Sequence, residues 1–366
     1  MLKEIIKFSS MKNILFFFSN TLIGGAETNI LKISSELNNL GYKIHLATLE
    51  DNGPLFLNFS DFQFESFTEI GRYEISPYNS IKKYKQLLES RKIDIVSSFG
   101  LRVELLVRIT SKLISPHVKI ISNIRASENW RKWYHVFLDK VTKSNVDIWV
   151  SNSRSAMLTF VNREGINADK VEVIYNFIDL KKRVNLNEPS VRFNIGVLAN
   201  YKLMKGHFNL IPIAKKLKFL GIDFKILCAG HDYTAGKFKR KILENGLENE
   251  ILLLGHILDK KSFFHEIDLF FLPSYVEGIS TSMIEAMSYG VPVIVSNVDG
   301  MPEAVENGVN GFIRDPDDLD GFVDDIINLQ STSVRKKFIE ESLFVLISKF
   351  DKSNNMKLWV NLFEKI

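Results

Sequence analysis

The sequence has little cysteine, no long apolar run and no clustered metal ligands. Of its 366 residues one is cysteine, Cys228, which excludes an internal disulfide and a cysteine-based zinc cluster. No apolar stretch approaches the ~18 residues of a membrane-spanning helix, and Ile14 to Phe18 is too short for a signal-peptide core. The seven histidines show no metal-ligand spacing, and no Gly-x-Ser-x-Gly nucleophile motif is present. We therefore expect a cytoplasmic protein that binds no metal ion.

What is present indicates a soluble globular protein with more than one domain. The hydrophobic fraction is 45% and the charged fraction 25%, both ordinary values. A length of 366 residues suggests two domains with a core each. Met11 followed by Lys12 and Asn13 would also make a natural chain start, so we expect residues 1–10 to be a dispensable extension.

Short apolar runs alternate with stretches of helical periodicity along most of the chain. In the first half these runs are residues 13–18, 43–49, 92–99, 118–124, 146–152 and 170–176. The same pattern restarts later, with runs at residues 193–199, 223–230, 250–255, 267–274, 291–297 and 310–315. Strands that alternate with helices indicate βαβ units, and therefore an α/β fold with parallel sheets covered on both faces.

A polar stretch ending in proline, residues 180–190, interrupts the pattern. We therefore predict two doubly wound Rossmann-like domains facing across a cleft, residues 1–185 and 186–348. A C-terminal helix, residues 349–366, is predicted to pack back toward the first domain. In such sheets ligands bind beyond the carboxyl ends of the strands, and the cleft between the domains is the expected site.

The stretch from Tyr275 to Gly290 carries two glutamates, Glu277 and Glu285, separated by a glycine and small hydroxyl residues. On one continuous helix, eight residues would leave these side chains roughly 80° apart. We therefore predict Glu277 in a loop and Glu285 in the first turn of a short helix, with three N-cap candidates, Ser280, Thr281 and Ser282. Free N–H groups at the helix start form an anion site. Carboxylates on either side of it suit a nucleotide sugar.

Each of these features also has an ordinary structural explanation. A Ser-x-x-Glu sequence is often only a helix cap, and a loop glutamate is often solvated. Gly24 and Gly25, after the first predicted strand, permit close approach of an anion or simply form a turn. Lys202 and Lys205, after the first strand of the second domain, can hold a diphosphate or face solvent. Asp315 and Asp317 resemble a metal pair, but N-capping of the next helix by Asp317 or Asp318 is the simpler explanation.

A basic and aromatic segment runs from Leu101 to Lys143. It holds nine Lys or Arg residues against three acids, a net charge of +6, and it contains Trp130, Trp133 and Tyr134. Such a mixture is typical of a membrane-surface face, and a solvated helix face is the alternative. No nucleic-acid motif accompanies it, so we expect no nucleic-acid partner.

The second domain resembles the retaining nucleotide-sugar glycosyltransferases of family 4, which have the two-domain GT-B fold. The family pattern is carried by the following residues: Pro273-Ser274, Glu277-Gly278, Glu285-Ala286-Met287, Gly290 and Pro292-Val293. Residues 299–313 are similar to the family's next glycine-rich segment, residues 150–179 to its interdomain approach, and residues 24–27 to its N-terminal loop. The match runs from about Met11 to the C-terminus, and its motifs are specific in the second domain and diffuse in the first.

The resemblance implies roles for particular residues. Glu285 should accept hydrogen bonds from the ribose, and Glu277 should face the donor sugar. Lys205 should neutralise the departing diphosphate, which makes Lys205 and Glu277 the catalytic candidates. The remaining donor-binding candidates are Gly24, Gly25, Asn200, Lys202, Gly278, Ile279, Ser280, Thr281 and Glu285. On the acceptor side, Arg125 and Glu128 follow the predicted strand at 118–124 and are expected to reach the cleft.

The chain departs from the family pattern at two places. Asn200 stands where the family often has arginine, and Lys202 is a substitute source of that charge. Gly278-Ile279-Ser280-Thr281 replaces the frequent Gly-Phe-Gly-Leu. Both departures leave the fold prediction intact and bear on the identity of the donor.

These inferences converge on a retaining hexosyltransferase. We expect its donor to be a nucleoside-diphosphate sugar, with UDP as the first candidate for the nucleotide, and we expect no metal cofactor. The acceptor is expected to be a hydroxyl of a growing, lipid-linked surface glycan, reached from the inner face of the cell membrane. One rival is a sugar-nucleotide epimerase of the same fold, which consumes the donor without an acceptor. The other is a non-catalytic nucleotide-sugar-binding subunit, for which Glu277 and Lys205 would be dispensable.

Overall fold

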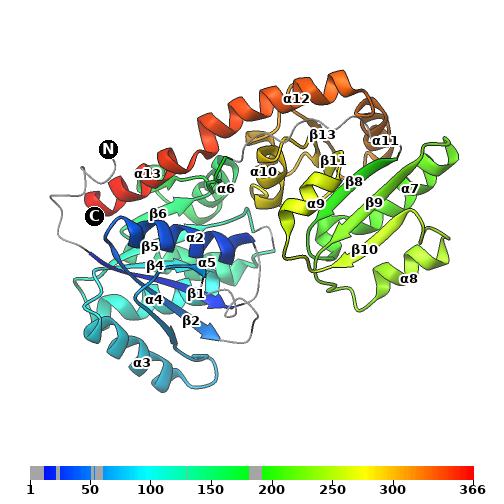
Figure 1. Cartoon of the computed structure of the whole chain (residues 1–366). Coiled ribbons are helices and arrows are strands. Elements are labelled where there is room, and N and C mark those ends of the chain that lie inside the picture. The colour runs from blue at the N-terminus through cyan, green and yellow to red at the C-terminus, as the bar shows by residue number, and fades with distance from the viewer. Residues whose placement is uncertain (1–11, 22–24, 51–52, 54–60, 129, 181–191) are drawn as a thin grey trace. The chain divides into compact units, whose positions relative to one another are not determined.

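The computed structural model describes residues 12–21, 25–50, 53, 61–128, 130–180 and 192–366 (Figure 1). The chain divides into two compact units. Unit 1 is formed by residues 1–176 and 353–366, and unit 2 by residues 177–352. The divisions fall at 176/177 and 352/353, where the sequence placed them at 185 and 348. The predicted boundary at residue 185 and the predicted extension at residues 1–10 lie outside the described residues.

Unit 1 is built on a seven-stranded sheet of order β3-β2-β1-β4-β5-β6-β7, in which every neighbouring pair is parallel. Its strands are β1 (Asn13–Asn20), β2 (Lys43–Glu50), β3 (Ser66–Glu69), β4 (Ile95–Phe99), β5 (Lys119–Ile124), β6 (Ile148–Ser151) and β7 (Val171–Val173). Its helices are α2 (Gly25–Asn39), α3 (Pro77–Ser90), α4 (Leu101–Ile114), α5 (Trp133–Thr142), α6 (Arg154–Phe160) and the C-terminal α13 (Lys352–Lys365).

Unit 2 is built on a six-stranded parallel sheet of order β10-β9-β8-β11-β12-β13. Its strands are β8 (Phe193–Leu198), β9 (Phe224–Ala229), β10 (Ile251–Gly255), β11 (Leu269–Leu272), β12 (Val293–Ser296) and β13 (Phe312–Arg314). Its helices are α7 (Leu210–Phe219), α8 (Lys237–Glu244), α9 (Lys260–Glu266), α10 (Thr281–Ser288), α11 (Leu319–Asn328) and α12 (Thr332–Val345).

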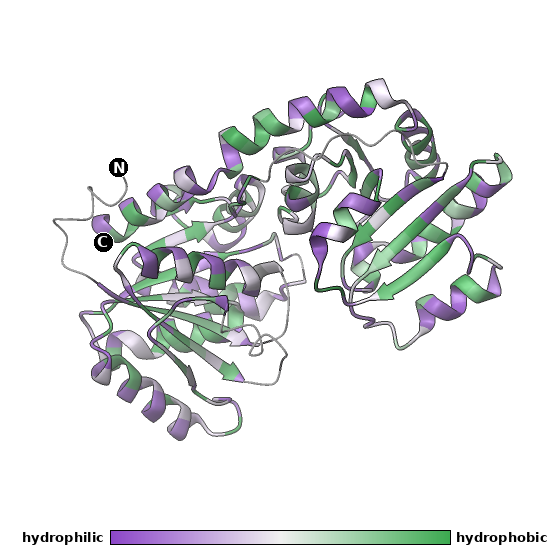
Figure 2. Cartoon of the chain, in the orientation of Figure 1, coloured by the Kyte–Doolittle hydropathy of each residue, from purple (hydrophilic) through white to green (hydrophobic). Residues whose placement is uncertain are grey.

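The strands form where the apolar runs predicted them because a strand covered on both faces must be apolar along its whole length. Figure 2 shows the strands of unit 2 as largely hydrophobic and the helices as mixed. The fold prediction of two parallel α/β units is confirmed. One strand was missed: β3 lies at the edge of its sheet, is only partly buried, and has no apolar run.

The C-terminal helix α13 packs against the sheet of unit 1 through aromatic side chains. The ring of Trp359 lies 6.3 Å from that of Phe16 on β1, and the ring of Phe363 lies 5.8 Å from that of Tyr42. Trp359 and Phe363 are both buried, so the helix is part of the core of this unit. Within the described residues, no helix is both long and apolar enough to cross a membrane.

Candidate functional site

The candidate site lies at the carboxyl edge of the unit 2 sheet. Parallel strands end at the same edge, so the loops that follow β8, β11 and β12 come together there. The loop after β8 carries Lys205, the loop after β11 carries Glu277, and the turn after β12 carries Asp299. Strand β11 lies directly beside β8 in the sheet, although the two are far apart in the sequence.

Gly206 allows the first two of these loops to touch. Its φ is +68°, and a Cβ at this position would lie 1.8 Å from the backbone oxygen of Pro273. No side chain can be accommodated at that distance. The backbone N–H of Tyr275 also donates to the carbonyl of Met204 at 2.8 Å. Lys205 is thereby held against the loop that carries Glu277.

Lys205 and Glu277 form an ion pair. The Lys205 Nζ donates to Glu277 Oε1 at 2.5 Å, and the two side chains keep 22% and 13% of their surface exposed. Ser274 Oγ donates to the same carboxylate oxygen at 3.4 Å. The backbone N–H of Glu277 donates to Asp299 Oδ2 at 3.2 Å, which fixes the loop backbone. The pair is partly accessible, so an anionic ligand can reach the ammonium group.

Helix α10 begins next to this pair, and its N-cap differs in detail from the prediction. Ser280 is the N-cap, because its Oγ accepts from the backbone N–H of Met283 at 3.3 Å. Thr281 is already helical, so the predicted capping box from Ser282 to Glu285 is wrong, and Glu285 lies in the second turn instead of the first. Ile279 is buried directly before the cap. The first amides of α10 still lie at the carboxyl edge of the sheet, where an anion is favoured.

Glu285 pairs with a residue that the sequence did not indicate. Its Oε2 lies 2.7 Å from the Nζ of Lys260, the first residue of α9, and Glu285 itself is buried. The nearby rings of His231 and His256 are stacked with centroids 4.5 Å apart. Burial, with smaller contributions from the charges of His231 and Lys260, lowers the pKa of His256. The neutral form of His256 is therefore favoured.

Asn200 and Lys202 are turned toward the neighbouring β9 loop. Asn200 Oδ1 accepts from the backbone N–H of His231 at 3.0 Å. The ammonium of Lys202 lies 4.7 Å from the centre of the Tyr233 ring. In this state Lys202 therefore contacts an aromatic face, while Lys205 is the lysine beside Glu277.

Sequence reasoning assigned no role in this site to four residues: Gly206, Ser274, Asp299 and Lys260. Ser274 lies two residues beyond the end of β11 and Asp299 three residues beyond the end of β12, and this place beyond a strand end was the signal that could have found them. Asp299 has a φ of +44°, which is unusual outside glycine. Of the two predicted N-cap residues of the helix after Asp315, Asp318 is the one that takes this role. Asp318 caps α11 by accepting from the Gly321 N–H at 2.9 Å, and Asp317 accepts from the Tyr275 hydroxyl at 2.8 Å.

Among the described residues, no group of three or more histidine, cysteine or acidic side chains is positioned to hold a metal ion.

In unit 1 the two acceptor-side candidates, Arg125 and Glu128, have different surroundings. Arg125 follows β5, and burial lowers its pKa to about 10, so that it remains charged at neutral pH. Glu128 Oε2 instead accepts from the Nε of Arg131 at 2.5 Å. Gly25 is the first residue of α2, and Gly24 lies outside the described residues.

The basic segment from 101 to 143 is less exposed than its composition suggested. Arg108 is fully buried and bonds Asp139 at 2.5 Å and Glu104 at 2.6 Å. The side chain of Arg131 is 2% exposed and also pairs with Asp139. Part of the positive charge is therefore neutralised inside unit 1. Arg131 therefore contributes no exposed charge to this basic segment, because its partners Asp139 and Glu128 hold it in the interior.

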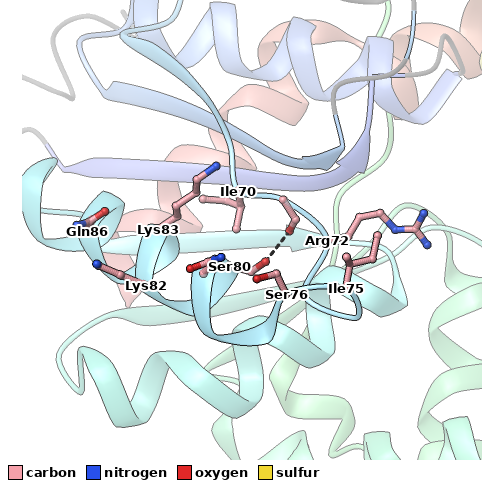
Figure 3. A pocket seen from close by; sticks show the side chains of 10 residues that line it. Ile70, Arg72, Ile75, Ser76, Ser80, Lys82, Lys83 and Gln86 are labelled. Carbon is pink, nitrogen blue, oxygen red and sulfur yellow. Dashed lines mark hydrogen bonds between the residues drawn. The ribbon is translucent and has the colours of Figure 1, made fainter.

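A cavity of 540 Å³ lies elsewhere in unit 1, between the end of β3 and helix α3, and is lined by residues 70–72, 75–76, 79–80, 82–83 and 86 (Figure 3). Arg72 and Lys82 extend to opposite sides of it (Figure 3). It contains none of the predicted site residues.

We expect Gly206→Ala to disrupt the site locally. The added methyl group meets a backbone atom that cannot move aside, so stability should fall by roughly 1–3 kcal/mol and the Lys205 loop should shift. Gly246→Ala is the matched control, because Gly246 has a similar φ of +62° but open space around it. Urea unfolding of both variants tests this. Equal losses of stability in the two would show that the approach to Pro273 has no special role.

Comparison with known families gives two consecutive matches. The Glycosyltransferase Family 4 model matches residues 23–182, and the model of glycosyl transferases group 1 matches residues 179–342.

Individual relatives were found by sequence and by structure. The UDP-Gal:alpha-D-GlcNAc-diphosphoundecaprenol alpha-1,3-galactosyltransferase of Escherichia coli is 26% identical over 316 residues, 77% of this chain and 79% of that protein. A 41.2 kDa protein encoded in the cps region of Klebsiella pneumoniae is 24% identical over 265 residues, 69% and 70% of the two chains. Among solved structures, Anabaena HepE in complex with UDP-glucose superposes with a TM-score of 0.83 at 19% identity, covering 97% of this chain and 100% of that one. The structural likeness shows that the fold is shared.

Proposed function

The chain belongs to the glycosyltransferases of family 4, and we propose that it is a retaining enzyme that transfers a hexose from a UDP-sugar to a glycan hydroxyl. The observation that carries this proposal is the Lys205–Glu277 ion pair beside the amino end of α10, at the carboxyl edge of the unit 2 sheet. One ammonium group, a row of helix-end amides and two carboxylates suit a ligand that has phosphates between two hydroxyl-bearing parts. The names of the relatives support UDP, since the E. coli protein is described by UDP-Gal and HepE is complexed with UDP-glucose.

In the proposed reaction the bond between the sugar C1 and the β-phosphate oxygen breaks, while the acceptor oxygen attacks C1 from the same face. The proton of the acceptor hydroxyl passes to the departing phosphate oxygen, so no separate side-chain base is required. Negative charge grows on the diphosphate as the bond breaks. In this proposal Lys205 and the α10 amides stabilise that charge, and the contacts that hold them in place before the reaction support this role.

Glu277 has a second role in this proposal. In the free chain it neutralises and positions Lys205, and with donor bound it accepts hydrogen bonds from the sugar hydroxyls. We also propose that no divalent cation takes part, because Lys205 and the helix amides supply the positive charge that the leaving diphosphate needs.

Glu285 is proposed to bind the ribose of the donor, and substitution of Glu285 tests this contact. Glu285→Ala should weaken UDP binding by roughly 1.5–3 kcal/mol, as expected when charge-assisted hydrogen bonds are lost. Lys260→Met is the matched control, since it removes the partner at 2.7 Å but leaves the carboxylate in place. Isothermal titration calorimetry with UDP measures both variants. An unchanged affinity in folded Glu285→Ala would show that the ribose contact is misassigned.

The acceptor is proposed to be lipid-linked and delivered at an anionic membrane surface. Helix α5 exposes a group of large apolar side chains, Trp133 at 79%, Tyr134, Phe137 and Val141, and α4 exposes Leu113 at 81%. Lys132 and Lys140 are exposed on the same segment, whereas Arg131 is not. Aromatic rings and basic side chains together suit the membrane interface.

The third prediction is therefore that the protein co-sediments with vesicles containing anionic lipid and is released by added salt. Lys132→Glu with Lys140→Glu should weaken this binding at least tenfold, because each basic residue near the surface contributes about 1 kcal/mol. Phe219→Ser, which removes an aromatic ring that is 89% exposed in unit 2, is the control and should have no effect. A protein that stays in the supernatant at low salt would refute membrane association and leave the transferase proposal standing.

A further inference from the structure

Arg125 has two buried guanidinium nitrogens that lack a hydrogen-bond acceptor, and the charge of Glu27 acts on it without a salt bridge between them. These nitrogens are Nε and Nη2, which are inaccessible and, within the described part of the chain, have no hydrogen-bond acceptor. Other interior arginines are paired: Arg108 with Asp139 and Glu104, Arg131 with Asp139, and Arg335 with Asp268. A buried donor without an acceptor lowers the stability of the folded protein, because it loses its hydrogen bonds to water and gains none within the protein. Its retention in the fold therefore calls for an explanation.

The guanidinium group of Arg125 is contacted along one edge by Asn176 and on one face by the ring of Phe99. Its Nη1 donates to Asn176 Oδ1 at 3.4 Å, an oxygen that also accepts from the Asn29 side chain at 2.8 Å. The Arg125 Cζ lies 5.2 Å from the centre of the Phe99 ring, at the carboxyl end of β4. Phe99 and Asn176 thus orient the group and leave its Nε–Nη2 edge without an acceptor.

The Nε–Nη2 edge of a guanidinium group can bind an oxyanion through two parallel hydrogen bonds. We propose that Arg125 forms an oxyanion subsite in unit 1, which binds a phosphate or carboxylate group of the acceptor. The inference rests on the proposed function in taking the acceptor as the source of the ion. Part of the Arg125 side chain remains exposed, and in this proposal a change of its rotamer brings the Nε and Nη2 donors to the ligand.

The cavity beside α3 is the competing anion site in the same unit. It is lined by Lys82 and Lys83, whose ammonium groups enter no ion pair among the described residues. These lysines are exposed, however, and already hydrated, so their unpaired state carries no energetic cost. Arg125 is favoured because its unpaired donors are buried.

The test uses the full chain saturated with UDP and titrated with inorganic pyrophosphate at low ionic strength. The expected result is binding by the wild type and at least tenfold weaker binding by Arg125→Gln, with UDP affinity changed less than twofold. Arg125→Lys keeps the charge but not the fork and should fall between the two. Lys82→Gln with Lys83→Gln is the control and should bind pyrophosphate as the wild type does.

Thermal unfolding without added anion separates a ligand site from a structural role. Removing buried donors that lack an acceptor should leave the melting temperature of Arg125→Gln unchanged or raised. A clearly lowered melting temperature would identify a structural residue and overturn the proposal. So would equal weakening of UDP and pyrophosphate, which would place the donor diphosphate at Arg125, or loss of pyrophosphate binding only in the double lysine variant. Failure of the glycosyltransferase proposal would instead appear as absence of UDP binding in the wild type.

Discussion

Lys205→Ala is expected to lower kcat by about 10²–10³ while changing the affinity for the donor much less. In the resting site the ammonium is already compensated by Glu277 at 2.5 Å, so its contribution to donor binding is limited. During the reaction the diphosphate gains charge, and the stabilisation by Lys205 grows with it. The effect should therefore appear in kcat and kcat/KM together, as expected for an interaction made mainly in the transition state.

Lys202→Ala is the matched control for this prediction. It removes a lysine three positions earlier whose ammonium lies over the Tyr233 ring at 4.7 Å. Its kcat should remain within a few-fold of the wild type. Steady-state kinetics with the donor varied measure both variants. A Lys205→Ala enzyme with normal kcat and only a raised KM would mean that Lys205 binds the ground state and does not assist bond cleavage.

Arg108→Met is expected to lower the free energy of unfolding by about 3–5 kcal/mol. Arg108 is fully buried and bonds Asp139, Glu104 and the Ser122 hydroxyl, with its guanidinium 4.3 Å from the centre of the Trp149 ring. Its removal takes a positively charged partner from two buried carboxyl groups, those of Glu104 and Asp139. Burial already raises the pKa of Glu104, so this carboxyl has little capacity to remain charged alone.

Arg102→Met is the control for the stability prediction. Arg102 pairs with Glu50 at 2.8 Å and also with Glu74, but its side chain is 36% exposed. Because solvent screens such pairs, its loss should cost less than about 1 kcal/mol. Urea unfolding at neutral pH measures both. Similar small losses would show that the network around Asp139 does not hold unit 1 together.

The strands were predictable because each one is a local apolar run. All six runs of the second half, from residue 193 to 315, contain a strand of the unit 2 sheet. The edge strand β3 has no such run, since three of its residues are only partly buried and the fourth is exposed. Local sequence therefore determined the elements but not the order in which the strands pair.

The pairing of Lys205 with Glu277 could not be derived from local pattern. The two residues are 72 positions apart, and they meet because β8 lies beside β11 and because Gly206 permits contact with the Pro273 carbonyl. Only the family resemblance brought them together in advance. The burial of Arg131 could not be predicted from composition. Its acidic partners Glu128 and Asp139 are nearby in the sequence, but no local pattern shows that Arg131 pairs with them in the interior.

The central claim is acceptor-dependent sugar transfer with retention at C1, and proton NMR of the reaction mixture tests it most directly. The protein is incubated with a UDP-hexose, with and without a lipid-linked diphosphate glycan acceptor, and the anomeric signals are followed. We predict that UDP is released only when acceptor is present and that the new glycoside has the α configuration of the donor. Conversion of the donor into another UDP-sugar without acceptor, or a β-linked product, would contradict the claim.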